Sequence, residues 1–275
     1  MADDTNILQT IAESNRMRVA RRSEMTPRAQ LEERARGLAA AELAASAGGA
    51  FAFPFEEALR APGMSFICET KKASPSKGVI EPDYDPVAIA RDYEAAGAAA
   101  VSCLTEARWF KGSPKHLMGM VEALDIPVLR KDFIVDDYQI YEARAWGASA
   151  VLLIVSLLDN EQLAAYIALC HELGMSALVE AYEPAEVPRA VAAGARVVGV
   201  NNRDLRTFEV DFGRSIELRR TVPADVLFVS ESGVRTRDDV AALEAAGVDA
   251  VLIGETLMRA ADKRAALDEL RGGRR

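Results

Sequence analysis

The segment from Phe66 to Gly78 combines acidic and basic side chains in a way that could support chemistry. A short apolar run that predicts a buried strand ends at Glu69, and three lysines, two serines, a proline and a glycine lie within the next nine residues. Burying a strand up to a carboxylate and crowding ammonium groups beside it costs free energy unless an anion binds there. A solvated loop whose lysines only confer solubility is the alternative, so the ends of the other strands must decide.

Charged side chains also stand at the ends of other predicted strands. Lys131 and Phe133 follow a strand at 127–130, and Glu180 ends a strand at 176–180. A single glutamate at a strand end is more often a helix cap or half of a salt bridge. Six charged groups from five strands instead predict a shared site, which comprises Glu69, Lys71, Lys131, Glu180, Arg203 and Glu231.

A repeating unit of strand and helix must position these residues. A helix-like segment, a glycine and a short β-rich run recur at Gly97, Gly147, Gly194 and Gly247, and glycine can take the left-handed conformation that ends a helix. Strands are predicted at 65–69, 99–104, 127–130, 149–155, 176–180, 196–200, 226–230 and 249–253. Helices are predicted at 86–96, 114–124, 136–146, 159–173, 183–193, 213–220, 236–246 and 258–270.

Near-continuous apolar strands that alternate with amphipathic helices predict a parallel sheet covered by helices. Eight such units predict an α/β fold in the form of a single (β/α)8 TIM barrel, whose reactive face is the rim at the carboxyl ends of the strands. An open, doubly wound sheet is the alternative architecture. It is disfavoured because no G-x-G-x-x-G motif follows the first strand.

The loops after the last two predicted strands favour phosphate binding. Barrels commonly bind phosphate there, through backbone N–H groups of glycine turns and a helix N-terminus. Ser232 and Gly233 follow the seventh strand, and Gly254 and Glu255 follow the eighth. Ser74 can reach inward from the first loop, so we predict that these residues hold the phosphate of a small anionic substrate.

Residues 1–64 precede the first strand and are predicted to form a helical extension packed on the catalytic barrel, which takes residues 65–275. Ile7, Leu8 and Ile11, followed by several arginines, predict a basic amphipathic helix, and residues 27–46 predict a second helix. The extension either plugs one end of the barrel or roofs the active site. The residues alone leave both possibilities open.

Composition narrows the functional classes. Half of the residues are hydrophobic, which gives ample material for a large core, and a net charge of −9 argues against a broad basic face for nucleic acid. No apolar run is long enough for a membrane span or a signal peptide. The scattered cysteines Cys68, Cys103 and Cys170 fit a reducing cytoplasm and offer no metal site. His116 and His171 lie in helical patterns and are expected to be structural.

Five motifs together carry a family resemblance: Glu69–Gly78, Val128–Ile134, Leu178–Glu180, Gly199–Leu205 and Glu231–Gly233. Through them the chain resembles the indole-3-glycerol-phosphate synthase family over nearly its whole length. That family converts 1-(2-carboxyphenylamino)-1-deoxyribulose 5-phosphate into indole-3-glycerol phosphate and releases CO₂ and water. The resemblance implies a carboxy-lyase of tryptophan biosynthesis that needs neither a cofactor nor a metal.

The resemblance also implies roles for the charged rim residues. Lys131 would donate a proton to the substrate carbonyl as the aromatic carbon attacks it. Lys71 would pair with the carboxylate or the phosphate of the substrate, and it is a second candidate for proton transfer. Glu180 would assist the dehydration or stabilise positive charge on the nitrogen, and Asn201 would hydrogen-bond the substrate.

The remaining residues of the resemblance bind and orient. Arg203 together with Glu69 would hold the charged network in place, and Phe133 would pack on the aromatic ring. Glu231 and Ser232 are expected to contact the substrate. The phosphate would be held by Ser74, Gly233, Gly254 and the backbone of Glu255.

Ring closure needs a proton donor at a carbonyl oxygen, and we expect a lysine among other cations to lose its proton more easily than a free lysine. Thr70 and Ser230 depart from the family pattern and are expected to tune polarity near the rim. Glu255 places a carboxylate beside the proposed phosphate, and its side chain is expected to point away.

Three other functions are compatible with a phosphate-binding barrel. Phosphoribosylanthranilate isomerase is the nearest, but it lacks the Lys-Asp-Phe motif found at 131–133 and is usually shorter at the N-terminus. A class I aldolase would use Lys131 or Lys71 to form a Schiff base, and a non-enzymatic binding protein would tolerate neutral rim residues. The chain is too short for a second fused barrel, so any partner enzyme would be separate.

Overall fold

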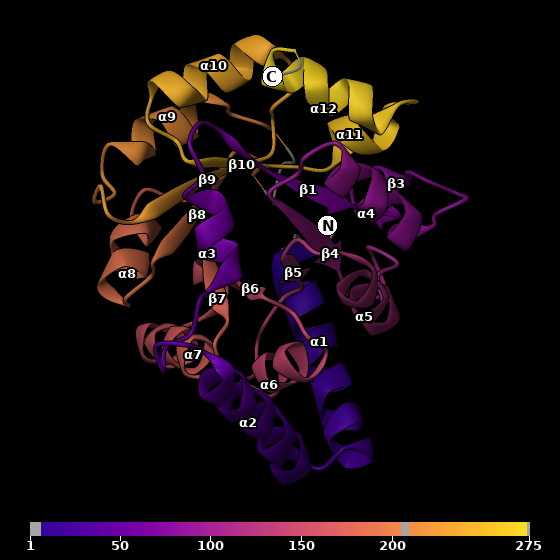
Figure 1. Ribbon diagram of the computed structural model, residues 1–275, viewed down its shortest axis with the longest axis vertical. Coiled ribbons are helices and arrows are strands. Elements are labelled where there is room, and N and C mark those ends of the chain that lie inside the picture. The colour runs from indigo at the N-terminus through magenta and orange to yellow at the C-terminus, as the bar shows by residue number, and fades with distance from the viewer. Residues whose placement is uncertain (1–6, 205–208, 274–275) are drawn as a thin grey trace, which may run out of the picture.

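The strands of the protein form a central ring that helices surround (Figure 1). The computed structural model describes residues 7–204 and 209–273. Within these ranges, eight parallel strands close into a barrel in which neighbours along the chain pair and β1 pairs with β10. The strands are β1 (Ser65–Thr70), β4 (Ala100–Leu104), β5 (Val128–Lys131), β6 (Ala150–Ile154), β7 (Ser176–Ala181), β8 (Val197–Asn201), β9 (Leu227–Glu231) and β10 (Ala250–Ile253). The predicted barrel is therefore confirmed.

The helices between the strands lie close to their predicted positions. Gly97, Gly147, Gly194 and Gly247 all have positive φ angles, between 79° and 90°, as the helix-ending role requires. The connecting helices are α4 (Pro86–Ala95), α5 (Pro114–Ala123), α6 (Tyr138–Ala145), η1 (Val155–Leu157), α7 (Asn160–Glu172), α8 (Glu186–Ala192), α9 (Gly213–Arg219), α10 (Arg237–Ala245), α11 (Glu255–Arg259) and α12 (Lys263–Arg271).

Two segments differ from the prediction. The helix predicted at 258–270 is divided into α11 and α12, because the chain becomes extended at Ala260 and the Asp262 side chain caps the start of α12. The loop after β1 contains a short hairpin, formed by β2 (Ala73–Ser74) and β3 (Gly78–Val79), that the sequence did not reveal.

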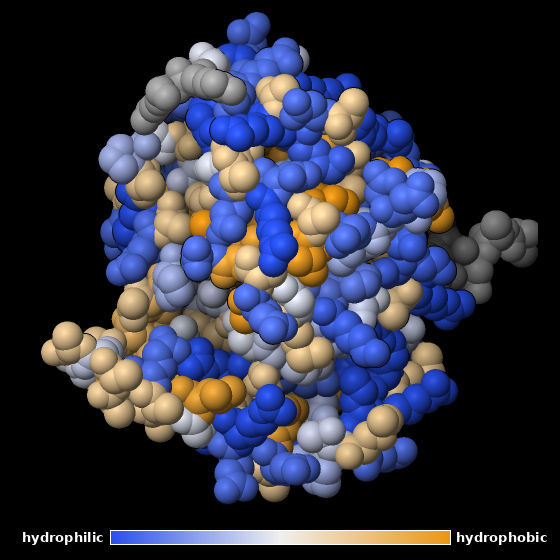
Figure 2. Space-filling model, turned by 45° about the vertical axis from the view of Figure 1, so that its right-hand side comes forward, coloured by the Kyte–Doolittle hydropathy of each residue, from blue (hydrophilic) through white to orange (hydrophobic). Residues whose placement is uncertain are grey.

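Alternation along the strands divides the core into two layers. Ile67, Leu129 and Leu178 belong to the cluster inside the barrel. Phe66 and Val179, each next to one of these residues, belong to the larger cluster between strands and helices. Apolar side chains on both faces explain the near-continuous apolar runs in the sequence. The face shown in Figure 2 is mostly hydrophilic, with hydrophobic residues in small groups among the charged ones.

The N-terminal helices are α1 (Ile7–Met25), α2 (Arg28–Ala45) and α3 (Pro54–Leu59). Phe55 and Leu59 of α3 join the interior cluster, and Ser65 at the start of β1 donates a hydrogen bond to a carbonyl of α3, so α3 closes the amino-terminal end of the barrel. Helix α1 contacts the loop after β5 at the opposite end, and α2 lies against α6. Both suggested roles of the extension are thus present, in different helices.

None of the helices in the described ranges has the length and apolar character that crossing a membrane requires.

Candidate active site

A pocket of about 500 Å³ opens at the carboxyl ends of the strands. Glu231 lies beneath it, where its carboxylate contacts Lys131. The other residues predicted for the site all line this pocket, namely Glu69, Lys71, Ser74, Lys131, Phe133, Glu180, Asn201, Arg203, Ser232, Gly233, Gly254 and Glu255. Residues that are far apart in the sequence, from six strands or the loops after them, therefore meet at one place.

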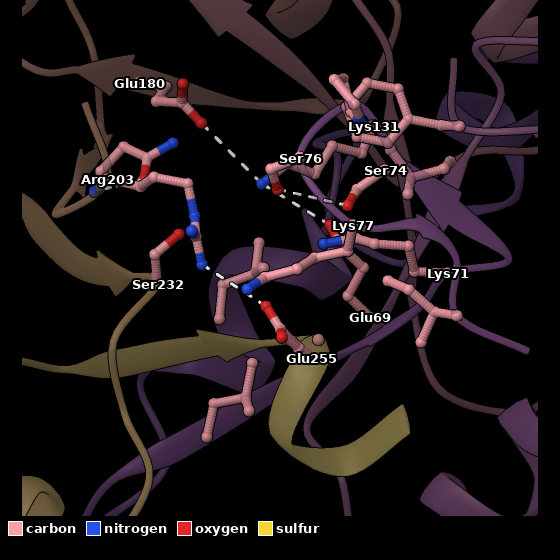
Figure 3. A pocket seen from close by; sticks show the side chains of 18 of the residues that line it. Glu69, Lys71, Ser74, Ser76, Lys77, Lys131, Glu180, Arg203, Ser232 and Glu255 are labelled. Atoms are coloured by element: carbon pink, nitrogen blue, oxygen red, sulfur yellow. Dashed lines mark hydrogen bonds and ion pairs between the residues drawn. The ribbon is translucent and has the colours of Figure 1, made fainter. Parts of the chain in front are cut away.

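Lys131 lies at the centre of a group of carboxylates. Its Nζ is 2.6 Å from Oε2 of Glu231, 3.7 Å from Oε2 of Glu69 and 3.8 Å from Oε2 of Glu180. Lys71 Nζ lies 2.5 Å from Oε1 of Glu69, so Glu69 bridges the two lysines. Figure 3 shows Glu180 on one side of the pocket, and Lys131, Lys71 and Glu69 on the other.

Two glycines in or next to strands make room for these glutamates. A Cβ atom on Gly199 of β8 would collide with Oε1 of Glu231, and a Cβ atom on Gly254 would lie 2.5 Å from Oε1 of Glu69. Each glycine therefore permits a carboxylate to lie against the backbone of the neighbouring strand. Gly254, predicted as a phosphate ligand, also has this second use.

The electrostatics keep Lys131 charged. Burial acts to lower its pKa, but the charges of Glu231, Glu69 and Glu180 outweigh burial and raise the pKa well above its ordinary value. The expectation of a lysine among cations that releases its proton easily is therefore wrong, because its nearest charged neighbours are acids. Such a lysine holds its proton at neutral pH.

The pKa values of two carboxylates beside Lys131, Glu69 and Glu180, shift in opposite directions. Burial acts to raise the pKa of Glu69, but Lys71 and Lys131 outweigh burial and lower it. Burial and the charge of Glu231 raise the pKa of Glu180 to about 8, although Lys131 and a hydrogen bond from Asn201 act in the other direction. Glu69 is thus a fixed anion, whereas Glu180 can gain or lose a proton near neutral pH.

An aromatic wall stands beside the charges. The rings of Phe110 and Phe133 lie 6.0 Å apart, and both residues line the pocket. Phe110 was not predicted, although its place in the loop after the second strand could have indicated it. Ile7, Leu8 and Ile11 of α1 also line the pocket. Their apolar spacing was recognised in the sequence, and the structure places them along the pocket.

The predicted phosphate end contains left-handed backbone. Ser232 and Gly233 have φ angles of 66° and 94°, and a Cβ atom on Gly233 would lie 2.9 Å from Val210. Glu255 does not point away as expected. Its Oε2 is 3.6 Å from Nη2 of Arg203, and its Oε1 is 3.1 Å from Nε of Arg259.

Three further expectations need correction. Arg203 pairs with Glu255, whereas Glu69 pairs with the lysines, so these two residues belong to different groups. Thr70 accepts a hydrogen bond from Tyr84 on the outer side of the barrel. Ser230 bonds with Asn202 and Ser215, also outside the interior. The hydroxyls of these two residues face away from the rim because they occupy outward positions of their strands.

The cysteines and histidines match their expected structural roles. Cys68, Cys103 and Cys170 are buried and carry free thiols. His116 packs edge-on against Tyr84, and His171 packs in the same way against Phe53. Both histidines lie on the outer helices rather than at the pocket.

Comparison with solved structures supports the fold. The crystal structure of a 3-hexulose-6-phosphate synthase matches with a TM-score of 0.62 and 17% identity, covering 76% of this chain and 98% of the other. Thiamine phosphate pyrophosphorylase from Pyrococcus furiosus matches with a TM-score of 0.57 and 16% identity, covering 76% and 94%. At such low identity these matches show a shared barrel and nothing finer.

Sequence relatives are much more similar. Indole-3-glycerol phosphate synthase from Ruminiclostridium cellulolyticum is 56% identical over 80% of this chain and 85% of its own length. The protein of that name from Lachnoclostridium phytofermentans is 52% identical over 80% and 81%. Indole-3-glycerol phosphate synthase 2 from Streptomyces coelicolor is 54% identical over 80% and 85%.

The family model described as indole-3-glycerol phosphate synthase matches residues 8–270. This span includes α1 except its first residue, Ile7, and every strand of the barrel. The match thus covers the charged residues at the strand ends, nearly all of α1 and the barrel. The chain belongs to the indole-3-glycerol phosphate synthase family.

Proposed function

We propose that the pocket converts 1-(2-carboxyphenylamino)-1-deoxyribulose 5-phosphate into indole-3-glycerol phosphate, CO₂ and water. The observation that carries this proposal is the protonated Lys131, held among three carboxylates beside an aromatic wall. The reaction needs those two features together, a proton donor for a ketone oxygen and an apolar surface for an aryl ring. Membership of the family supports the same reaction.

The substrate has three parts, and the pocket offers a complement to each. The aryl ring packs against Phe110 and Phe133, under the apolar residues of α1. The aryl carboxylate pairs with Lys71, which lies on the same side of the pocket as Glu69. The phosphate binds to Ser74, Ser232, Gly233 and Gly254 and to the backbone of Glu255. At Ser232 and Gly233 a left-handed turn exposes N–H groups.

In the first chemical step, the aryl carbon that carries the carboxylate attacks the ketone carbon of the sugar chain. Lys131 donates its proton to the ketone oxygen as the new carbon–carbon bond forms. Loss of CO₂ then returns the electron pair of the broken bond to the ring and restores its aromaticity. Asn201 lies beside Glu180 and can hydrogen-bond the new hydroxyl group.

Dehydration completes the indole. The hydroxyl leaves as water after it receives a proton, and the adjacent carbon loses a proton to form the double bond. Glu180 suits this step because its pKa of about 8 lets it hold or release a proton near neutral pH. Glu69 and Arg203 are proposed to hold the charges on either side of the pocket, through Lys71 and Glu255 respectively.

A Schiff-base aldolase reaction is disfavoured by the same geometry. Formation of a Schiff base requires a neutral amine, and the carboxylates around Lys131 keep this amine protonated. We further propose that residues 1–64 and 65–275 act as one unit, since α1 covers the pocket that the barrel forms. The buried free thiols support a cytoplasmic location.

The test is to incubate the protein with the carboxyphenylamino-deoxyribulose phosphate and follow the appearance of indole fluorescence. The expected result is product formation by the unmodified protein and by Lys115→Met, which removes an exposed lysine of α5. Lys131→Met should form no measurable product. Absence of fluorescence from the unmodified protein between about pH 6 and about pH 9 would contradict the proposed function.

A further inference from the structure

Asn15 of α1 is a buried polar residue whose side-chain amide donates both of its hydrogen bonds to the barrel. Only 1% of its surface is exposed. Its Nδ2 donates to Oδ1 of Asp132 at 2.8 Å and to the carbonyl oxygen of Phe133 at 2.8 Å. Its Oδ1 accepts a hydrogen bond from Nη1 of Arg18 at 2.9 Å. Both donors and the acceptor of this amide are therefore satisfied.

The residues that Asn15 contacts follow directly after Lys131. Asp132 is itself fully held, because its Oδ2 accepts from Thr105 at 2.6 Å and its Oδ1 accepts from the backbone N–H of Phe133 at 2.9 Å. The backbone of Phe133 is thus bound from two sides, by Asn15 at its carbonyl and by Asp132 at its amide. This fixes the direction in which its ring enters the pocket.

Arg18, on the same helix, connects α1 to the loop of the other aromatic residue, Phe110. Arg18 Nη1 lies 3.5 Å from Oε1 of Glu106, whose carboxylate is fully buried. Glu106 accepts hydrogen bonds from the backbone N–H groups of Arg108, Trp109 and Phe110 at 2.7, 2.7 and 3.0 Å. The loop that carries Phe110 is therefore wound around a carboxylate that α1 contacts.

These contacts lie on the helix face that roofs the pocket. Leu8, Ile11, Asn15 and Arg18 are separated by three or four residues, so they lie along one side of α1. The first two residues of this stripe line the pocket, and the last two bind the loops beside it. A well-packed apolar residue would serve a purely structural interface as well as a buried amide does.

We propose that Asn15 is a positioning residue for the reaction, because it fixes α1 to the loop of Phe133 and, through Arg18 and Glu106, to the loop of Phe110. In this way one side chain sets the spacing between the two aromatic rings and the apolar roof. The inference rests on the proposed function, since it assigns these three surfaces to the aryl ring of the substrate. It predicts that Asn15 governs substrate binding more than the chemical step.

The test compares Asn15→Leu with Val19→Ala. Leucine keeps the branched shape of asparagine and removes its hydrogen bonds, whereas Val19 is a buried residue of α1 whose apolar side chain packs in the cluster between strands and helices. Asn15→Leu should raise KM about tenfold and change kcat less than about threefold, because Lys131 is held by its own carboxylates. Val19→Ala should lower the melting temperature and leave KM unchanged.

A binding measurement with a substrate analogue separates positioning from stability. The analogue has the ketone reduced to an alcohol, so it cannot cyclise, and its Kd should rise in Asn15→Leu by the same factor as KM. Asn15→Gln, which restores an amide, should recover part of the loss. An unchanged KM and Kd in Asn15→Leu, with an active unmodified protein, would overturn this inference alone. An inactive unmodified protein would overturn the proposed function and this inference with it.

Discussion

The two faces of strand β5 carry two ionic clusters of similar composition and different character. Arg130 points outward and is fully buried, with hydrogen bonds to Gln139 O at 2.5 Å, to Asp132 at 3.2 Å and to Glu142 at 3.3 Å. Its guanidinium also lies 4.4 Å from the ring centroid of Trp146. Lys131, the next residue, points inward to the pocket. Strand alternation alone separates the two clusters.

The outward cluster is balanced. Arg130 and Arg22 face Asp132 and Glu142, with Nε of Arg22 2.7 Å from Oε1 of Glu142. The charges of this cluster cancel, although Nε of Arg22 makes no hydrogen bond to any described residue.

The inward cluster contains one acid more than it has bases, namely Glu69, Glu180 and Glu231 against Lys71 and Lys131. Oε1 of Glu231 has no hydrogen-bond partner among the described residues. Burial, and then the charge of the extra acid Glu231, raises the pKa of Glu180. Balanced charge thus marks the structural cluster, and an excess of acid beside a pocket marks the cluster that is proposed to react.

Replacing the central cation of each cluster, Lys131 or Arg130, should separate the two clusters most clearly. Lys131→Met should reduce turnover by about a thousandfold or more, because the ketone oxygen loses its proton donor, and should leave the fold intact. Steady-state kinetics and circular dichroism measure the two effects. Turnover close to that of the unmodified protein would refute the assignment of Lys131.

Arg130→Met should have the opposite effect. The substitution leaves Asp132 and Glu142 buried with fewer partners, which should cost about 3–5 kcal/mol of unfolding free energy. Urea unfolding measures this loss. Activity of the remaining folded protein should fall far less than in Lys131→Met. A stable Arg130→Met protein would show that the outward cluster is dispensable.

Glu180→Gln should lower kcat about a hundredfold, because glutamine keeps the size of the side chain and cannot transfer a proton. The pH profile gives a sharper readout. A limb near the pKa of about 8 should be present in the unmodified protein and absent from the variant. Persistence of that limb in Glu180→Gln would assign the titration to another group.

The stability of the protein should also depend on Glu180. Between the unfolded pKa of about 4.3 and the folded pKa of about 8, the folded state binds more protons than the unfolded state. This group therefore makes the unfolding free energy fall as pH rises through that window. Glu180→Gln should remove this slope, so its stability relative to the unmodified protein should increase from pH 5 to pH 8 in urea unfolding. An unchanged difference would contradict the raised pKa.

The smallest expected effect concerns Gly199. Gly199→Ala would press against Oε1 of Glu231 and displace the carboxylate that holds Lys131. Turnover should fall about tenfold with little change in KM, since the proton donor shifts by a fraction of an ångström. Gly194→Ala is the control for a glycine outside the cluster, where open space surrounds the new atom but a φ of 90° strains it. It should lose stability and keep its kcat.

Strand ends were predictable from the sequence because period-two alternation and the parallel barrel together dictate which residues reach the rim. The sequence alone therefore allowed Lys131, Glu180 and Glu69 to be assigned to one site. Their pairing could not, because it depends on the register around the closed barrel. For the same reason the sequence placed Lys131 among cations, when its neighbours are acids.

The loops account for most of the site features that the sequence did not predict. Phe110 enters the pocket only because Glu106 binds three successive backbone N–H groups, which no spacing rule reveals. Glu255 turns toward Arg203 from the first position of α11, a helix that begins three residues before the predicted one. Thr70 and Ser230 lie one position from inward residues, so they face outward even though they border Glu69 and Glu231.

Barrel closure has a consequence for how the protein is made. Strand β1 emerges from the ribosome early but pairs with β10, the last strand. That pair cannot form before β10 has been synthesised, so the barrel closes only when nearly all of the chain is available. The acids around Lys131 come from β1, β7 and β9 and meet only then. The nascent chain therefore carries no proton-transfer site, and catalytic competence is a late event in biogenesis.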